Sequence, residues 1–343
     1  MRSVLSSFFY CFILFVFSVL SSVFVGYAQQ EKTFLPEIRG TVRGKFEYQP
    51  DINKGRFGVR NARFGISGYV TEHLQYKSEV DLSDEGRIRM LDAYVRLNPI
   101  QNGRFTIGQM RVPFTIDAHR SPHEQYFANR SFIAKQVGNV RDVGAAAYYK
   151  IQTRLPIILE AGIFNGSGLY ENKNFWTDNF NFSTKLQLLS PSGFNLTLSM
   201  QKSKTGDVFT YMYNGGMYYH AGPWHLEAEY MLKKYEKGAF PDMSAVDAFI
   251  CYDLPVRRLF KKISFLCRYD YMGDHSNGIY GPDRKLQLSD AERHRATAGL
   301  TFSLAKPFVS DIRINYEKYF YSKEAPIKIS EQDKIVVELM TRF

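Results

Sequence analysis

Apolar and polar side chains alternate with a period of two residues through almost the whole chain. In residues 38–48, for example, Arg43 and Lys45 share one face, and Val42 and Phe46 share the other. Side chains of a β-strand point alternately to its two faces, whereas an α-helix repeats every 3.6 residues. The pattern therefore predicts an all-β protein. Segments of this kind lie at residues 38–48, 57–71, 74–82, 88–97, 104–110, 143–150, 157–164, 179–189, 194–202, 209–220, 223–234, 244–254, 262–272, 294–304, 309–321 and 334–343.

The connections between these segments alternate in length. Those after even-numbered segments are short, whereas residues 111–142, 165–178, 273–293 and 322–333 form long connections after odd-numbered ones. Transmembrane barrels have short periplasmic turns and longer external loops. Most segments are also close to the ~9–11 residues that a tilted strand needs to cross a bilayer. We therefore expect a 16-stranded antiparallel transmembrane β-barrel at residues 38–343.

A secreted β-sandwich is the alternative that alternation alone leaves open. The space between two packed sheets is a dry core. Here nearly every segment carries Lys, Arg, Glu or Asp on the face opposite its apolar one. A charged inner face suits a barrel of 16 to 18 strands, because such a barrel leaves an aqueous channel. The polarity of the two faces therefore favours the barrel.

The first residues have the features of a secretory signal peptide. Arg2 precedes a long apolar run, and Gly26 and Ala28 are the small residues before the expected cleavage site. An uncleaved membrane anchor is the alternative, since the apolar run is long enough to span a bilayer. We expect residues 1–28 to be removed and residues 29–37 to form a short periplasmic segment before the barrel.

Composition bears on other classes of protein. Cys251 and Cys267 are expected on opposite faces of their strands as free thiols, and two cysteines make no disulfide framework. Lys and Arg number 44 against 34 Asp and Glu, a formal net charge of +10. Such a surplus is compatible with nucleic-acid binding, but export of the chain excludes that partner. The sequence has no catalytic motif or nucleotide fingerprint, so we expect no enzyme, cofactor or metal.

The longest connection, residues 111–142, is both basic and aromatic. Apolar residues such as Phe127 and Phe132 argue against disorder in so long a loop. We expect this third loop to fold into the lumen, where its cations would attract and bind oxyanions. An external cap that meets lipopolysaccharide or water is the alternative. The candidate anion-binding residues are Arg111, Arg120, Arg130, Lys135 and Arg141 in the loop, and Arg39, Arg43, Lys45, Arg63 and Arg96 on the strands.

The last segment ends on an aromatic side chain. Leu339, Thr341 and Phe343 share the face that would meet lipid, and an aromatic ring fits the girdle at the membrane–water interface. An open strand edge in hydrocarbon leaves backbone groups unsatisfied, so this segment is expected to pair with the first. Its terminal aromatic residue resembles the signal read by the barrel-assembly machinery, and these three residues are the candidate assembly signal.

Several motifs occur in a fixed order in the first half of the chain. An arginine- and glycine-containing strand, FGVRNARFGISG, is followed by DAYV, by IGQMRVPF, by ANRS and later by GIFNGSG. Over about residues 55–170 these motifs resemble the phosphate-selective porin O and P family. The resemblance implies trimers of anion-passing barrels with a third loop folded inside, and an arginine ladder and lysine cluster in the phosphate specialists. Arg111 and Arg130 match the family by their position in the motifs.

Together these features predict an outer-membrane porin of a Gram-negative, Bacteroidetes-like bacterium. It would form a water-filled channel for passive diffusion of polar solutes and small anions, phosphate or polyphosphate among them. The expected partners are outer-membrane lipids and lipopolysaccharide, the barrel-assembly machinery, small anionic solutes and further copies in a homotrimer. A non-conducting structural or adhesive barrel and an enzyme at the barrel rim are the alternatives.

Overall fold

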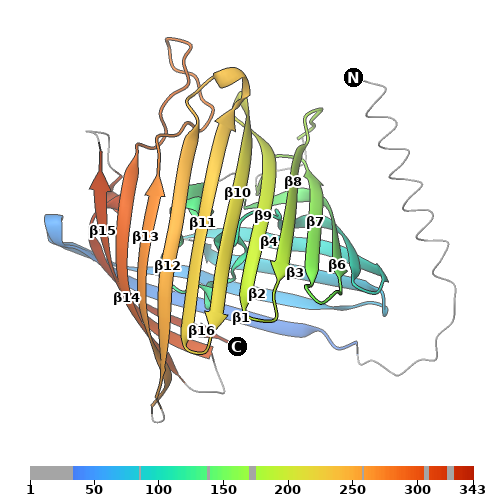
Figure 1. Ribbon diagram of the computed structural model, residues 1–343, viewed down its shortest axis with the longest axis horizontal. Helices are drawn as coiled ribbons and strands as arrows, with labels where there is room; N and C mark the ends of the chain where they lie inside the picture. Colours follow the sequence, from blue (N-terminus) through green and yellow to red (C-terminus); the bar gives the residue numbers. More distant parts are fainter. Residues whose placement is uncertain are drawn as a thin grey trace.

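The computed structural model is a closed β-barrel (Figure 1). Each strand pairs antiparallel with its neighbours in sequence, and β1 pairs with β16. The predicted antiparallel 16-stranded barrel is therefore confirmed. The strands are β1 (Glu37–Gln49), β2 (Lys54–Tyr69), β3 (Leu74–Asp84), β4 (Arg87–Ile100), β5 (Gly103–Arg111), β6 (Arg141–Ile151), β7 (Ile157–Phe164), β8 (Asn181–Leu189), β9 (Phe194–Thr205), β10 (Val208–Ala221), β11 (Trp224–Tyr235), β12 (Met243–Pro255), β13 (Phe260–Met272), β14 (Arg293–Leu304), β15 (Val309–Tyr321) and β16 (Lys334–Arg342).

Every predicted segment coincides with one of these strands, with limits that differ by a few residues. The signal peptide predicted at residues 1–28 lies outside the described part of the chain, as does most of the segment predicted at residues 29–37. No helix within the described residues is long and apolar enough to cross a membrane. The structure describes residues 34–84, 86–136, 140–169, 175–256, 259–304, 309–322 and 328–343.

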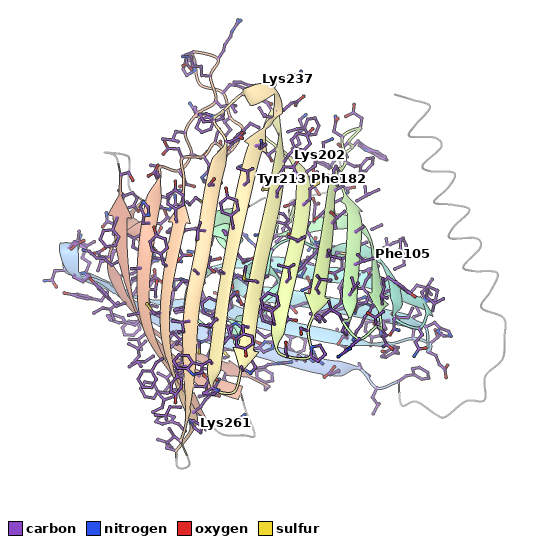
Figure 2. All side chains as sticks on the ribbon, viewed as in Figure 1. Phe105, Phe182, Lys202, Tyr213, Lys237 and Lys261 are labelled. Carbon is purple, nitrogen blue, oxygen red and sulfur yellow. The ribbon has the colours of Figure 1, made fainter. Side chains whose placement is uncertain are left out.

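The two faces of the barrel wall differ in polarity as the alternation predicts. Side chains cover the outer surface of the wall in Figure 2, and those of Leu198 and Phe265 there are about half exposed. Inward-facing Arg43 and Arg295 are almost completely buried. Cys251 is buried and Cys267 is exposed, and both are free thiols, as expected for adjacent strands on which they face opposite ways.

Short turns join the strands at one end of the barrel, shown at the bottom of Figure 1. In the turn between β8 and β9, Gly193 has a φ of +87° and its N–H donates to the Ser190 carbonyl. A Cβ atom at residue 193 would lie 2.0 Å from the backbone oxygen of His220. Only glycine adopts this conformation at such close approach, so Gly193 fixes the geometry of the turn.

The connection between β5 and β6, hereafter the β5–β6 segment, contains short helices. These are η2 (Asp117–His119), η3 (Pro122–Glu124) and α2 (Phe132–Gln136). Ser121 and Glu124 form a capping box at the start of η3, in which Glu124 accepts the Ser121 N–H at 2.8 Å. Contacts within the segment therefore order this part of it, independently of its contacts with the barrel wall.

Candidate functional site

Two inward-facing glutamates of β11 hold the first part of the β5–β6 segment. The carboxylate of Glu229 accepts the backbone N–H groups of Ile116 at 2.6 Å and Asp117 at 3.3 Å. Glu227 accepts both Nη atoms of Arg120. A bidentate, charge-assisted pair of this kind is among the stronger polar contacts in proteins. Arg120 is one of the candidate anion-binding residues. In the structure its side chain instead forms an ion pair that holds the segment against the barrel wall.

Arginines on β1, β13 and β14 hold the later part of the segment through its carbonyl groups. Arg43 donates to the carbonyl of Ala128 at 2.7 Å. Arg268 donates to the carbonyl of Asn129 at 3.0 Å, and Arg295 donates to that of Arg130 at 2.8 Å. Because β13 and β14 are neighbours and β1 lies three strands from β14 around the barrel, these donors fix the segment along one part of the inner wall.

An apolar cluster adds a second kind of contact between the β5–β6 segment and the wall. Phe132 and Ile133 are fully buried against methionines of β10, β11 and β13, Met212, Met231 and Met272. Methionine adapts to irregular gaps because its side chain is unbranched and flexible. These inward apolar residues interrupt a largely polar inner face where the segment packs.

Water-accessible space remains on the other side of the segment, along β1 to β7. Two cavities of 530 Å³ and 260 Å³ lie there, and both are lined by Lys77, Tyr94, Arg96 and Ser121. Their charged lining comprises seven basic residues and four acids. The basic residues are Arg39, Arg63, Lys77, Arg96, Arg104, Arg111 and Arg342, and the acids are Glu37, Glu79, Asp92 and Glu160.

Three arginines of the smaller cavity bind no carboxylate. Arg96 donates to the hydroxyl of Thr106 at 3.1 Å, and Arg104 lies 3.5 Å from the centroid of the Tyr148 ring. Arg111 donates to a backbone carbonyl of the β5–β6 segment. Among the residues that the structure describes, none of the three has a carboxylate within 4 Å. Their positive charges are therefore not compensated by ion pairs.

The remaining candidates divide into paired and unpaired cations. Arg130 also binds backbone carbonyls, those of Asp117 and Arg120, without an ion pair in the described part of the chain. Lys135 is exposed. The paired cations are Arg39 with Glu37 at 2.6 Å, Arg43 with Glu338 at 2.6 Å, Lys45 with Glu47 at 2.8 Å and Arg63 with Asp81 at 3.0 Å.

Arg141 requires a correction, because it was expected in the loop. It is the first residue of β6, and Arg111 is the last residue of β5, directly opposite in register. The side chain of Arg141 is buried and its Nε donates to Asp92 at 2.7 Å. The loop limits were drawn too wide, since an arginine at a strand end fits either assignment. Arg141 thus belongs to a wall ion pair.

Arg104 is a further candidate for anion binding, and it is not among the residues predicted from the sequence. It lies on the same inward face as Thr106 in β5 and stacks on Tyr148 of β6. Alternation alone predicts its inward direction. That it has no ion pair among the described residues depends on its neighbours in the register, Tyr148 directly opposite on β6 and Arg96 on β4, which lies opposite Thr106.

The His119 side chain contacts the backbone of the β5–β6 segment to which it belongs. Its Nε2 lies 2.6 Å from the carbonyl oxygen of Val112 and 3.3 Å from the backbone nitrogen of Phe114. Burial lowers the pKa of His119 well below its ordinary value, and the positive charges of Lys185 and Arg111 lower it further. The imidazole is therefore neutral at pH 7 and adds no charge beside Arg111.

Three carboxylates on the inner wall lie close enough together to bind a cation. Oxygen atoms of Glu227, Glu229 and Asp247 lie within 4.8 Å of one another. The two glutamates already bind the β5–β6 segment, and Nε of Arg268 lies 3.9 Å from Asp247. Arginine side chains and backbone N–H groups thus supply the positive partners, and the cluster serves to anchor the segment.

The model of one protein family, described as phosphate-selective porin O and P, matches residues 39–187. That range contains β1 to β7, the β5–β6 segment and most of β8, and hence all three unpaired arginines of the smaller cavity. No curated protein is similar in sequence.

Solved structures with a similar fold include several outer-membrane proteins. An anion-selective porin from Comamonas acidovorans has a TM-score of 0.62 at 12% identity, with 90% of this chain and 98% of that chain covered. The trimer form of OmpT from Vibrio cholerae has a TM-score of 0.59 at 11% identity, covering 90% and 98%. The channel DcaP of Acinetobacter baumannii has a TM-score of 0.57 at 12% identity, covering 93% and 99%. These likenesses establish the fold, and residues 39–187 are similar to the phosphate-selective porin O and P family.

Proposed function

We propose that this protein is a porin of the bacterial outer membrane through which small solutes diffuse passively, with a preference for anions. The family match and the closed 16-stranded wall support a channel. One observation carries the anion preference: Arg96, Arg104 and Arg111 line one cavity and bind no carboxylate among the described residues. Uncompensated cations in a narrow pore raise the local anion concentration.

The β5–β6 segment narrows the lumen in this proposal. Its contacts run from Lys185 on β8 to Arg43 on β1, whereas the two cavities lie on the side of β1 to β7. Solutes would therefore pass between the segment and the early strands. The inward acids of the opposite wall have little influence on them, because Arg120 and N–H groups of the segment bind Glu227 and Glu229, and wall arginines bind acids such as Asp270 and Glu338.

Phosphate and polyphosphate are the oxyanions that we propose as solutes. Guanidinium groups bind phosphate oxygens through two parallel hydrogen bonds, and Arg96 and Arg104 lie close enough to line the same 260 Å³ space. A channel accounts for these side chains better than an enzyme at the rim does, because they line cavities inside the barrel that share four lining residues, and the sequence has no catalytic motif.

The partners of the protein are proposals too. A homotrimer is supported by the family and by the trimer form of OmpT, a structure with the same fold. Outer-membrane lipids and lipopolysaccharide would surround the apolar outer wall. Leu339, Thr341 and Phe343 would form the assembly signal on the outer face of the closing strand, and all three take part in or adjoin the pairing of β16 with β1.

Reversal potentials in planar bilayers under a potassium chloride gradient test the anion preference. The wild-type channel should favour chloride, and Arg96→Gln with Arg104→Gln should move the permeability ratio toward one. These two side chains are suited to the test because neither holds the β5–β6 segment. A cation-selective wild-type channel would refute the proposal.

Two control variants separate charge from structure. Arg104→Lys keeps the charge and should preserve most of the selectivity. Arg39→Gln removes a cation that is half-exposed and paired with Glu37, so its effect should be small. If Arg39→Gln changes selectivity as much as the double variant does, the uncompensated arginines have no special role.

A further inference from the structure

A row of outward-facing aromatic and basic side chains crosses four neighbouring strands near the rim with the long connections. Phe182 of β8 lies opposite Lys202 of β9, which lies opposite Tyr211 of β10, which in turn lies opposite Lys234 of β11. Figure 2 shows Phe182 and Lys202 in the upper half of the wall. Since neighbouring strands are ~4.8 Å apart, Lys202 and Lys234 stand about 10 Å apart along the row.

A third cationic side chain lies one row closer to the rim. Lys204 lies opposite Phe209 in the pairing of β9 with β10. The Phe209 ring is near both lysines, because Nζ of Lys202 is 4.3 Å from its centroid and Nζ of Lys204 is 5.9 Å from it. Cation–π contact of this kind holds an ammonium group at the surface of a ring without neutralising it.

Apolar rows begin immediately on the other side of this basic row. The next outward row across β8 to β11 contains Met200 and Tyr213, and the row after it contains Leu198 and Tyr230. Leu198, Tyr213 and Tyr230 are each more than 40% exposed. The lysines therefore stand where the apolar outer wall ends, at the level expected for lipid headgroups.

Two of these lysines lack a negative partner in the described part of the chain. In the described residues Lys202 and Lys204 have no carboxylate within ion-pair distance. Lys234 pairs with Asp242 at 3.3 Å, and both side chains are about half exposed. An outward-facing charge close to hydrocarbon is unfavourable unless it reaches water or an anionic headgroup. The site therefore has positive charge that an anionic headgroup could neutralise, and an apolar surface lies directly below it.

We propose that Lys202, Tyr211 and Lys234 of this row, together with Lys204 of the next row, bind a phosphate-bearing lipid of the membrane leaflet at this rim. Phosphate oxygens would accept from the Lys202 and Lys204 ammonium groups, with Lys234 at the far end of the row. The acyl chains would lie on the apolar rows of β8 to β11. The spacing between Lys202 and Lys234 suits a headgroup with two phosphates better than one with a single phosphate.

Native mass spectrometry of the folded full-length mature protein in detergent tests this site. The probes are bis-phosphorylated lipid A and, as the neutral reference, phosphatidylcholine. Wild type should bind lipid A in preference to phosphatidylcholine. Because each lysine near an anionic surface contributes on the order of a fivefold gain in binding, K202Q/K204Q should weaken lipid A binding about 30-fold.

Two single variants serve as matched controls. Lys237 lies in the turn above the same rim, off the barrel wall, and Lys261 lies at the opposite rim (Figure 2). K237Q and K261Q should each leave lipid A binding within about twofold of wild type, because headgroup attraction falls off with distance. Folding of every variant is checked by heat-modifiable gel mobility.

Three results would overturn the proposal. Unchanged lipid A binding in folded K202Q/K204Q would show that these lysines are not the site. Equal losses in K237Q or K261Q would show that net charge alone attracts the lipid. A change of oligomeric state in K202Q/K204Q without a change in lipid binding would assign the row to contact with a second copy.

Discussion

The ring of Phe343 lies directly over the backbone of Gly40, on the outer face of the seam that closes the barrel. A Cβ atom at residue 40 would come 2.2 Å from Cζ of the ring. The Gly40 N–H donates to the Phe343 carbonyl at 2.9 Å, and the Phe343 N–H donates to the Gly40 carbonyl at 3.1 Å. The absence of a side chain at one residue thus makes room for the aromatic ring of the other.

A side chain at residue 40 should impair closure of the barrel. Gly40→Val displaces the Phe343 ring from its place beside the last hydrogen bonds of the seam, although valine suits a strand. We expect a smaller heat-modifiable fraction in isolated membranes and an unchanged conductance for each channel that folds. Gly44→Val is the matched control, because a Cβ atom at residue 44 meets no atom within 4 Å. Equal folded fractions for the two variants would contradict this role of Gly40.

Removal of Glu227 should release the β5–β6 segment from the wall. In Glu227→Ala the guanidinium of Arg120 loses its bidentate partner and keeps only the looser pair with Asp117 at 3.7 Å, and removing one partner of a buried ion pair costs about 3–5 kcal/mol. Single-channel recordings should show a larger and noisier conductance. Glu47→Ala removes a glutamate that pairs with Lys45 of β1 and Arg56 of β2, away from the segment, and should leave the conductance steady. A wild-type trace from Glu227→Ala would show that the segment is held by other contacts.

The apolar anchor of the same segment can be tested by proteolysis. Phe132→Ala removes a fully buried ring from the methionine cluster, and such truncations cost about 3–5 kcal/mol. Trypsin should then cut folded protein after Arg130 or Lys135 faster than it cuts wild type. Phe265→Ala on the outer wall, where the ring is about half exposed, should not change the rate. Identical digestion of both variants would refute the anchoring role of Phe132.

The reactivity of the two thiols tests which side chains of β12 and β13 face outward. Cys267 faces outward and Cys251 is buried inside the wall. In proteoliposomes, a lipid-soluble maleimide should label the native protein at Cys267 alone, and a charged, membrane-impermeant maleimide should label neither residue. Both should react after unfolding. Cys267→Ser should abolish native labelling and Cys251→Ser should preserve it; the reverse pattern would mean that the register of β12 and β13 is inverted.

The strands were predictable because the two faces of the wall meet different surroundings. On β13, for instance, Arg268 and Asp270 contact the interior while Phe265 and Tyr269 cover the outside. A shift of one residue would exchange these sets, so alternation specifies the facing of each strand. The number of strands and their order around the barrel then follow from the count of alternating segments and from antiparallel pairing of neighbours.

The sequence does not predict which inward charged residues hold the β5–β6 segment and which line the cavities. Arg43 and Arg96 have the same local signature, a basic residue on an alternating strand. Arg43 nevertheless binds the carbonyl of Ala128, 85 residues away, whereas Arg96 remains without an ion pair in the described residues. That difference depends on where the β5–β6 segment packs. Strand patterns carry no information on such long-range contacts.

The off-centre position of the β5–β6 segment has an evolutionary consequence. Side chains that fasten it come mainly from β8 to β16, whereas those beside the cavities come mainly from β1 to β7. A substitution at Arg104 therefore changes the charge that solutes meet and leaves the fastening intact, while a change at Met231 does the opposite. Descendants of this gene can thus acquire new solute preferences in the first half of the coding sequence without sacrificing the stability supplied by the second.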